Sequence, residues 1–353
     1  MRETTLSAIQ HCPCGTIDGK PIVLFTIQNK RGGTLTFSNY GAAVQSLSVK
    51  DVRQKQTDVL LGYSRLDDYC NDAFYLGTVV GRCASRIVGE TVRLGSESVR
   101  LTQKAEGYHH HGGRLGFNKK VWRVVDVGVN SIKMQYTSAD GEEGYPGELT
   151  VTVDYTFDDD NNWIVDYSAV TDKPTFINLT QHAYFNLSGH DEGSILAHKL
   201  QIHAERYLPV NALLVPTGVL APVEKTPFDF RTATPIGLSI DGDNEQLRLG
   251  SGYDHSWVLE ESYSGELKQA ATVVGPKTGI TLNVFTTEPA VHFYSGNFLE
   301  PVTGKNGAQY RERSGFCLET QHFPDSPNHP HFPSIVLLPG EEFRSRTIFQ
   351  FST

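Results

Sequence analysis

Strict alternation of apolar and polar residues over residues 149–157 is the feature that most constrains the fold of this chain. One parity is apolar or aromatic and the other is Thr or Asp, the apolar set being Leu149, Val151, Val153, Tyr155 and Phe157. A period of two places alternate side chains on opposite faces of a strand, so this segment predicts a half-buried β-strand. The pattern recurs at residues 132–136, 163–169, 280–284, 335–337 and 343–351, with turn-forming clusters between the segments.

These short strands predict an all-β fold, a large antiparallel β-sandwich with few short helices. Residues 241–249 form the one modest helical candidate, and the apolar run 74–80 is interpreted as a further strand. All-β folds often place more than about 200 residues in one domain, so we expect a single domain over residues 1–353. The proline-rich stretches 208–230 and 323–333 are expected to form walls of a binding cleft.

A net charge of −9 argues against binding to nucleic acid or to an anionic membrane surface. A small neutral or cationic ligand fits this charge better. No apolar run approaches the length of a membrane span, and residues 1–7 lack the apolar stretch of a signal peptide. The five cysteines are an odd number spread over a long chain, which predicts free thiols in a reducing, cytoplasmic environment. Cys12 and Cys14 supply two ligands, too few for a closed metal site.

Residues 176–187 place one imidazole, His182, among amides and aromatic residues. Because histidine exchanges protons near neutral pH, His182 is the candidate general acid or base. Asn178, Gln181 and Asn186 are candidates for orienting this ring or a polar ligand. The alternative is a strand histidine whose ring is satisfied by backbone groups.

A second candidate, Glu319, follows the apolar run 316–318 and precedes a proline-rich loop, where we expect a strand to end. Burial beside apolar residues would make this carboxylate a better proton acceptor than a solvated one. The alternative is a glutamate at the protein rim in a surface ion pair.

Three further clusters complete the polar inventory. Arg82 and Arg86 lie in residues 81–87, and either guanidinium could hold ligand oxygens or anchor a structural carboxylate. Three adjacent histidines, residues 109–111, cannot all point one way on a strand, so a metal site from this run alone is not expected. Asp254 stands among aromatic residues in 252–257, a mixture that suits the apolar faces and hydroxyl edges of a sugar.

Six segments resemble, in order, the motifs of the galactose mutarotase (aldose 1-epimerase) family. They are residues 81–87, 111–122, 178–187, 252–255, 293–298 and 319–330. The resemblance covers nearly the whole chain. It implies a large antiparallel β-sandwich with a sugar cleft on one concave face, acting without a metal or other cofactor.

The resemblance also implies roles for single residues. Glu319 matches the general base of the family and His182 its general acid, and we expect them on opposite sides of a hexose. His111, Arg86 and Asp254 match sugar-binding positions. The implied activity is that of an aldose 1-epimerase, an isomerase whose small-molecule partner is an aldohexose such as galactose or glucose. We expect a monomer or weak homodimer.

The chain departs from the family pattern at two positions expected to bind substrate. Ser85 stands where the family has Asn, and His292 stands where it has Gln. Serine reaches less far than an amide and histidine adds a titratable group, so an altered sugar preference or pH dependence is expected.

Three other functions stay open at this point. A hexose-6-phosphate epimerase would need extra basic residues at the far end of the cleft. A catalytically silent sugar-binding protein would keep the cleft without accelerating any reaction. A glycoside hydrolase would use two carboxylates, for which Glu319 and Asp254 are the available pair.

Overall fold

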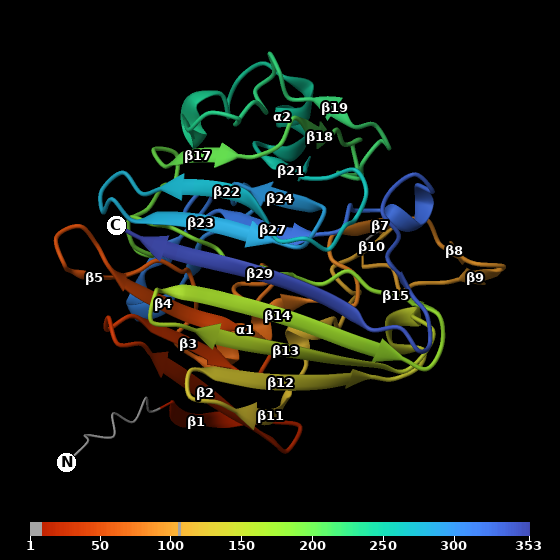
Figure 1. The fold of residues 1–353 in the computed structure, drawn as a ribbon, viewed down its shortest axis with the longest axis horizontal. Coiled ribbons are helices and arrows are strands. Elements are labelled where there is room, and N and C mark those ends of the chain that lie inside the picture. Colours follow the sequence, from red (N-terminus) through yellow and green to blue (C-terminus); the bar gives the residue numbers. More distant parts are fainter. Residues whose placement is uncertain (1–8, 105–106) are drawn as a thin grey trace.

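The computed structural model describes residues 9–104 and 107–353. Three antiparallel sheets contain most of the strand residues, one of nine strands and two of five. Figure 1 shows the strands of the nine-stranded sheet side by side across the molecule, with the β1–β5 sheet beneath one end. The predicted all-β, antiparallel sandwich is therefore confirmed.

The nine-stranded sheet is built around the C-terminal strand, which lies between β14 and β23 and so joins the two halves of the sheet. In spatial order its strands are β11 (Arg123–Val127), β12 (Ser131–Ser138), β13 (Leu149–Phe157), β14 (Asn162–Thr171), β29 (Phe343–Ser352), β23 (Thr281–Thr286), β22 (Lys268–Val274), β17 (Lys199–Ile202) and β20 (Thr234–Pro235). The alternating segments of the sequence match β12, β13, β14, β23 and β29, and residues 335–337 contain the short strand β28 (Val336–Leu337).

Two five-stranded sheets complete the framework. The first contains β1 (Gln10–Ile17), β2 (Lys20–Gln28), β3 (Thr34–Ser38), β4 (Val44–Lys50) and β5 (Gln56–Asp58), in that order. The second has the order β19 (Ala221–Pro222), β18 (Arg206–Leu208), β21 (Asp254–Val258), β24 (Ala290–Tyr294) and β27 (Cys317–Gln321). It carries much of the candidate site.

Five separate two-stranded sheets contain the remaining strands. They are β6 (Val79–Val80) with β16 (Thr180–Gln181), β7 (Arg86–Val88) with β10 (Tyr108–His110), β8 (Val92–Leu94) with β9 (Glu97–Val99), β15 (Thr175–Phe176) with β28, and β25 (Val302–Thr303) with β26 (Gln309–Tyr310). The apolar run 74–80 was expected to be one strand, but only β6 is extended. Tyr75 and Gly77 have φ angles of 59° and 69°, so the chain turns there before β6 begins.

Helix is scarce in the described part of the chain, where α1 (Leu66–Asn71) and α2 (Glu245–Gly250) are the two α-helices. The helix predicted at 241–249 begins later, because the Asn244 side chain accepts hydrogen bonds from the N–H groups of Gln246 and Leu247 and caps α2 there. Single 3₁₀ turns occur at Phe117–Lys119, Glu142–Gly144, Ile236–Leu238, Lys305–Gly307 and Ser326–Asn328. Within residues 9–104 and 107–353, no helix has the length and apolarity needed to cross a membrane.

Aromatic side chains fill the space between the sheets. Phe37 of the first sheet packs edge-on against Tyr155 of β13, with ring centroids 5.1 Å apart. Phe185 packs at 5.3 Å from Phe349 of β29 and at 5.8 Å from Phe316, which precedes β27. This continuous apolar core holds the strands that carry the site in fixed positions relative to β29.

Candidate active site

Neighbouring strands place three polar side chains in a row on one face of the second five-stranded sheet. In the register of these strands, Ser256 of β21 lies opposite His292 of β24, and His292 lies opposite Glu319 of β27. Directly opposed residues on adjacent strands point to the same face. The sequence suggested that a strand ends at Glu319, but β27 continues to Gln321, so Glu319 lies in its middle.

A second row lies two residues along the same strands and therefore on the same face. Asp254 lies opposite Tyr294, and Tyr294 lies opposite Cys317. Residues that alternate with these two rows, such as Phe293 and Trp257, point to the other face and join the buried aromatic core. Two parallel rows thus form the floor of a cleft.

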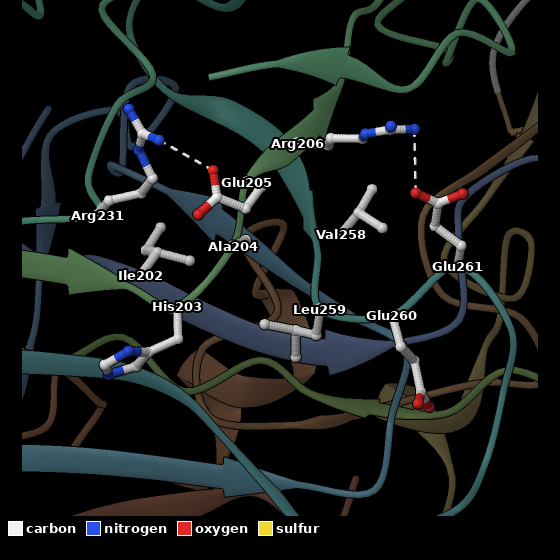
Figure 2. Close-up of a pocket in the computed structure, with 10 residues that line it drawn as sticks. All are labelled: Ile202, His203, Ala204, Glu205, Arg206, Arg231, Val258, Leu259, Glu260 and Glu261. Carbon is white, nitrogen blue, oxygen red and sulfur yellow. Dashed lines mark hydrogen bonds and ion pairs between the residues drawn. The ribbon is translucent and has the colours of Figure 1, made fainter. Parts of the chain in front are cut away.

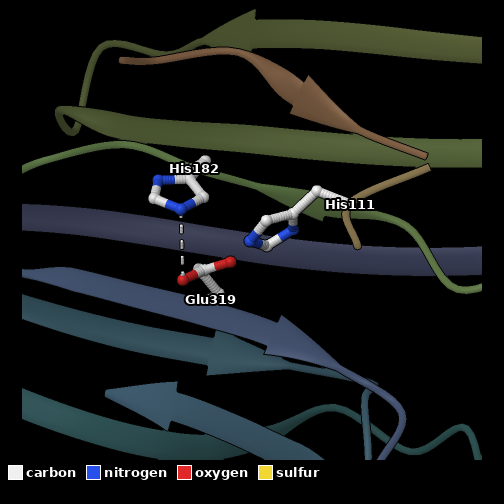
Figure 3. Close-up of side chains that lie close together, drawn as sticks. All are labelled: His111, His182 and Glu319. Carbon is white, nitrogen blue, oxygen red and sulfur yellow. Dashed lines mark ion pairs between the residues drawn. The ribbon is translucent and has the colours of Figure 1, made fainter. Parts of the chain in front are cut away.

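His182 approaches this floor from the segment that follows β16. Its backbone N–H donates to the carbonyl of Thr78, and its own carbonyl accepts from the N–H of Gly77, both at 2.9 Å. His182 is 4% exposed, and its Nε2 lies 3.7 Å from Oε1 of Glu319, which is 2% exposed (Figure 3). The ring therefore faces a carboxylate, unlike the backbone-satisfied histidine of the alternative interpretation, and Glu319 is buried instead of lying at the rim.

This distance corrects one expectation. We expected Glu319 and His182 on opposite sides of a hexose, but 3.7 Å is too short for a sugar ring to lie between them. They lie side by side instead. Such neighbours can address two oxygens bonded to the same carbon, as the ring oxygen and the anomeric hydroxyl of an aldose are.

His111 lies beside this pair at a tight turn, with a φ angle of 48°. Gly112 follows in the left-handed region, where any Cβ would collide with the carbonyl oxygen of Gly81. The backbone N–H of Ser85 donates to Nδ1 of His111 at 3.2 Å. Burial, reinforced by the neighbouring ring of His110, lowers the pKa of His111 well below its ordinary value. His111 is therefore a neutral ring whose Nε2 carries the hydrogen.

That tautomer bears on metal binding. His111, His182 and Glu319 each offer a ligand atom within 4.8 Å of the others, and two histidines with a carboxylate are a common set of metal ligands (Figure 3). A metal needs a lone pair on the coordinating nitrogen. Since Nδ1 of His111 accepts from Ser85, Nε2 is left as a hydrogen donor, so the cluster does not suit a metal.

Asp254 is held as a carboxylate at the other end of the floor. Burial raises the pKa of Asp254, but the hydrogen bond from Nε2 of His292 at 2.8 Å and the charge of Arg86 at 3.9 Å outweigh it and lower the pKa to about 2. Nδ1 of His292 is paired with Oγ of Ser256 at 2.9 Å. His292 thus binds Asp254 through Nε2 and Ser256 of the neighbouring strand through Nδ1.

Two polar atoms at this site are buried and have no hydrogen-bond partner among the described residues. They are Nε of Arg86, a donor, and Oε2 of Glu319, an acceptor. Unpartnered buried polar groups are unfavourable unless a ligand or water satisfies them. Their position suits a ligand that supplies both an acceptor and a donor, as a hydroxyl group does.

Aromatic side chains complete a cleft of about 300 Å³ around these groups. The ring of Tyr75 is stacked on His182 at 5.7 Å, while Tyr184, Tyr294 and Phe298 also line the space. Apolar ring faces next to a few fixed polar groups are typical of sites for small polar molecules. The two proline-rich loops are not among the lining residues, so the expectation that they form its walls is wrong.

A larger cavity of about 520 Å³ lies between β17, β18 and β21 (Figure 2). Its charged groups are already in ion pairs, with Arg231 paired to Glu205 at 2.9 Å, Arg206 to Glu261 at 3.0 Å and Glu260 to Lys268 at 2.5 Å. None of the residues proposed for chemistry line it. The smaller cleft is therefore the candidate active site.

The seven predicted site residues all line this cleft, namely Ser85, Arg86, His111, His182, Asp254, His292 and Glu319. Ser85 is already engaged there, since its Oγ accepts from Nε2 of Gln321 at 2.9 Å. Sequence reasoning missed Tyr75, whose loop was interpreted as a strand. It also missed Cys317, whose Sγ lies 3.6 Å from Nδ1 of His182 and whose spacing of two from Glu319 predicts a shared strand face.

Other candidates have structural roles. Arg82 is buried and donates to Ser138, Thr175 and the carbonyls of Ala139 and Pro146. Of the two arginines, Arg82 therefore has the structural role. His109 lies between the carbonyl of Thr102 and the hydroxyl of Tyr145.

The amides near His182 do not orient it. Asn178 binds the backbone of His322, Gln181 binds Tyr155 and the carbonyl of Gly77, and Asn186 binds the carbonyls of Gly193 and Ser314.

Comparison with known proteins agrees with this geometry. The family model described as aldose 1-epimerase matches residues 23–350. The chain belongs to the aldose 1-epimerase family. The galactose mutarotase of Mus musculus is 43% identical over 315 residues, covering 89% of this chain and 90% of the relative. The aldose 1-epimerase of Escherichia coli K12 is 37% identical over 345 residues, covering 97% and 99%.

Solved structures of the aldose 1-epimerase family share this fold. The galactose 1-epimerase of Lactobacillus acidophilus NCFM superimposes with a TM-score of 0.86 at 28% identity, covering 98% of each chain. A GalM/aldose epimerase homologue from C. elegans superimposes with a TM-score of 0.85 at 29% identity, covering 93% of this chain and 98% of its own.

Proposed function

We propose that the protein is an aldose 1-epimerase, an isomerase that interconverts the α and β anomers of galactose and glucose. Glu319 is the general base and His182 the general acid. The observation that carries this assignment is their contact, 3.7 Å between two buried groups at the floor of a hexose-sized cleft. Membership of the aldose 1-epimerase family supports the same reaction.

The reaction needs two proton transfers at neighbouring oxygens. Glu319 takes the proton of the anomeric hydroxyl while Nε2–H of His182 gives a proton to the ring oxygen, so the C1–O5 bond breaks and C1 becomes an aldehyde. Rotation about the C1–C2 bond presents the other face of the aldehyde. Reclosure returns the proton from Glu319 to the new anomeric hydroxyl and returns the ring-oxygen proton to His182. Each positioned transfer accelerates a reaction by about 10²–10⁴-fold.

The remaining cleft residues hold the sugar. Arg86 and Asp254 offer a donor and an acceptor to the hydroxyl edge, and the Nε2–H of His111 is a further donor close to the reacting pair. Tyr75 and Phe298 present apolar surface to the sugar faces. Ser85 and His292 complete the proposed binding set, with His292 acting through Asp254.

The charge of the cleft favours an unphosphorylated sugar. Arg86 is the only lysine or arginine among the described residues that line the cleft, and its guanidinium already faces the carboxylate of Asp254. Lys104 lies nearby but over the ring of Tyr75, 4.3 Å from its centroid. A hexose 6-phosphate would need a cation that is free to meet its phosphate.

We further propose one domain over residues 1–353, a cytoplasmic location, a monomer or weak homodimer, and no requirement for a metal, other cofactor, nucleic acid or membrane. Light scattering coupled to size exclusion tests the oligomeric state. Full activity after dialysis against a chelator is the result expected for metal independence.

Polarimetry of freshly dissolved α-galactose and α-glucose tests the proposed activity. The enzyme should accelerate equilibration of both sugars above the spontaneous rate and should leave galactose 6-phosphate largely untouched. A purified, folded protein that accelerates neither sugar would be a binding protein instead. Release of reducing ends from an oligosaccharide would identify a hydrolase.

A further inference from the structure

The buried thiol of Cys317 lies against the nitrogen of His182 that faces away from Glu319. Its Sγ is 3.6 Å from Nδ1, and the side chain is inaccessible to solvent. Both groups are held rigidly, because Cys317 is fixed on β27 by its pairing with Tyr294 and His182 is fixed by backbone hydrogen bonds to residues 77 and 78. Among the described residues, this sulfur is the hydrogen-bond partner of Nδ1.

The proposed reaction dictates what Nδ1 must do. His182 exchanges its proton with the sugar through Nε2, which is the nitrogen that faces Glu319. When Nε2 has given its proton to the ring oxygen, the neutral imidazole must keep its remaining hydrogen on Nδ1. The charged and neutral forms of the ring therefore both present an N–H on this side, and both need an acceptor there.

We infer that Cys317 is a positioning residue for His182: its sulfur accepts the Nδ1 hydrogen and so keeps Nε2 as the nitrogen that exchanges protons with the sugar. This inference rests on the proposed function and goes beyond it, because it assigns a tautomer and a partner to the general acid. Burial raises the pKa of the Cys317 thiol well above its ordinary value, so the sulfur stays a neutral thiol.

A thiol is an unusual partner for a catalytic histidine, and its weakness has a chemical consequence. A carboxylate at this position would stabilise the imidazolium and make it a poorer acid. A neutral sulfur is a weak acceptor without charge, so it fixes the tautomer without placing a second carboxylate beside the imidazole. This arrangement suits His182, which acts as an acid in the ring-opening step.

The test uses three variants. Cys317→Ala removes the acceptor, Cys317→Ser keeps one, and Cys83→Ala is the matched control because Cys83 is also a fully buried thiol but is paired with Tyr145 instead of His182. We expect Cys317→Ala to lower kcat for galactose by about five- to tenfold with KM within twofold, the equivalent of one neutral hydrogen bond. Cys317→Ser should recover most of this loss, and Cys83→Ala should match the wild type.

The second readout is the tautomer itself, from ¹⁵N NMR of histidine-labelled protein with the His182 signal assigned by its loss in His182→Asn. We expect neutral His182 to carry its hydrogen on Nδ1 in the wild type and in Cys317→Ser, and a mixture of tautomers in Cys317→Ala.

An Nε2–H tautomer in the wild type, or equal kcat in Cys317→Ala and Cys83→Ala, would overturn the inference. Failure of the proposed function is distinguishable, because a protein without epimerase activity would still report its tautomer.

Discussion

Replacement of Glu319 by Gln keeps the shape of the side chain and removes its ability to take a proton. Glu319 is 2% exposed and is the carboxylate beside His182, since Asp254 is held at the other end of the floor by His292 and Arg86. Positioned general bases contribute about 10²–10⁴-fold, which is about 3–5 kcal/mol of barrier. We expect Glu319→Gln to fall in the upper half of this range.

The double variant with His182→Asn makes the prediction sharper. Both groups act in the same ring-opening step and lie 3.7 Å apart, so their losses should not multiply. We expect the double variant to be no more than about threefold slower than the slower single variant. The coupling would then amount to several kcal/mol.

The assay is polarimetry on α-galactose, with the spontaneous rate subtracted and thermal unfolding used to confirm that each variant folds. Glu288→Gln is the matched control, since Glu288 is also a buried carboxylate paired with a histidine, His322 at 2.6 Å, but does not line the cleft. It should keep kcat within about twofold. Activity of Glu319→Gln within tenfold of the wild type, or losses that multiply in the double variant, would refute the reasoning.

Three further outcomes are expected. Arg86→Lys should raise KM for galactose about tenfold with a smaller effect on kcat, because an ammonium cannot reproduce the forked donors of a guanidinium; steady-state kinetics checks this. His292→Gln cannot bridge Ser256 and Asp254 as the imidazole does, so the galactose-to-glucose ratio of kcat/KM should change severalfold, and an unchanged ratio and pH profile would argue against a role in specificity. Burial lowers the pKa of His255 from 6.5 to about 3, so the unfolded chain binds one more proton at this residue between these values, and the contribution of His255 to stability should fall by about 1.4 kcal/mol per pH unit below pH 6. Urea unfolding at pH 7.5 and 5.5 should show a shallower dependence for His255→Gln.

The fold was predictable where one physical rule acts alone. Residues 149–157 alternate strictly because β13 has one face in the core and one outside, and the predicted and observed bounds coincide. The rule failed at residues 74–80, which are apolar because a buried turn packs there. Neither the φ of Tyr75 nor that of Gly77 can be inferred from hydrophobicity.

The candidate site was predictable as a set of residues but not as an arrangement. The family motifs identified His182 and Glu319, yet they could not show that the two lie side by side or which ring nitrogen meets which partner. His292 illustrates the limit. The sequence marks it as a departure from the family, whereas its engagement of Asp254 and Ser256 depends on the register of two strands far apart in the chain.

The two polar rows across β21, β24 and β27 restrict how this enzyme can evolve. One residue inserted in β24 would turn His292 and Tyr294 into the core and bring Phe293 out to face the sugar. Insertions or deletions inside these strands should therefore abolish activity, while substitutions of single residues in the two rows can change which groups face the sugar. New sugar preferences are thus expected to arise through single substitutions that leave the strand register unchanged.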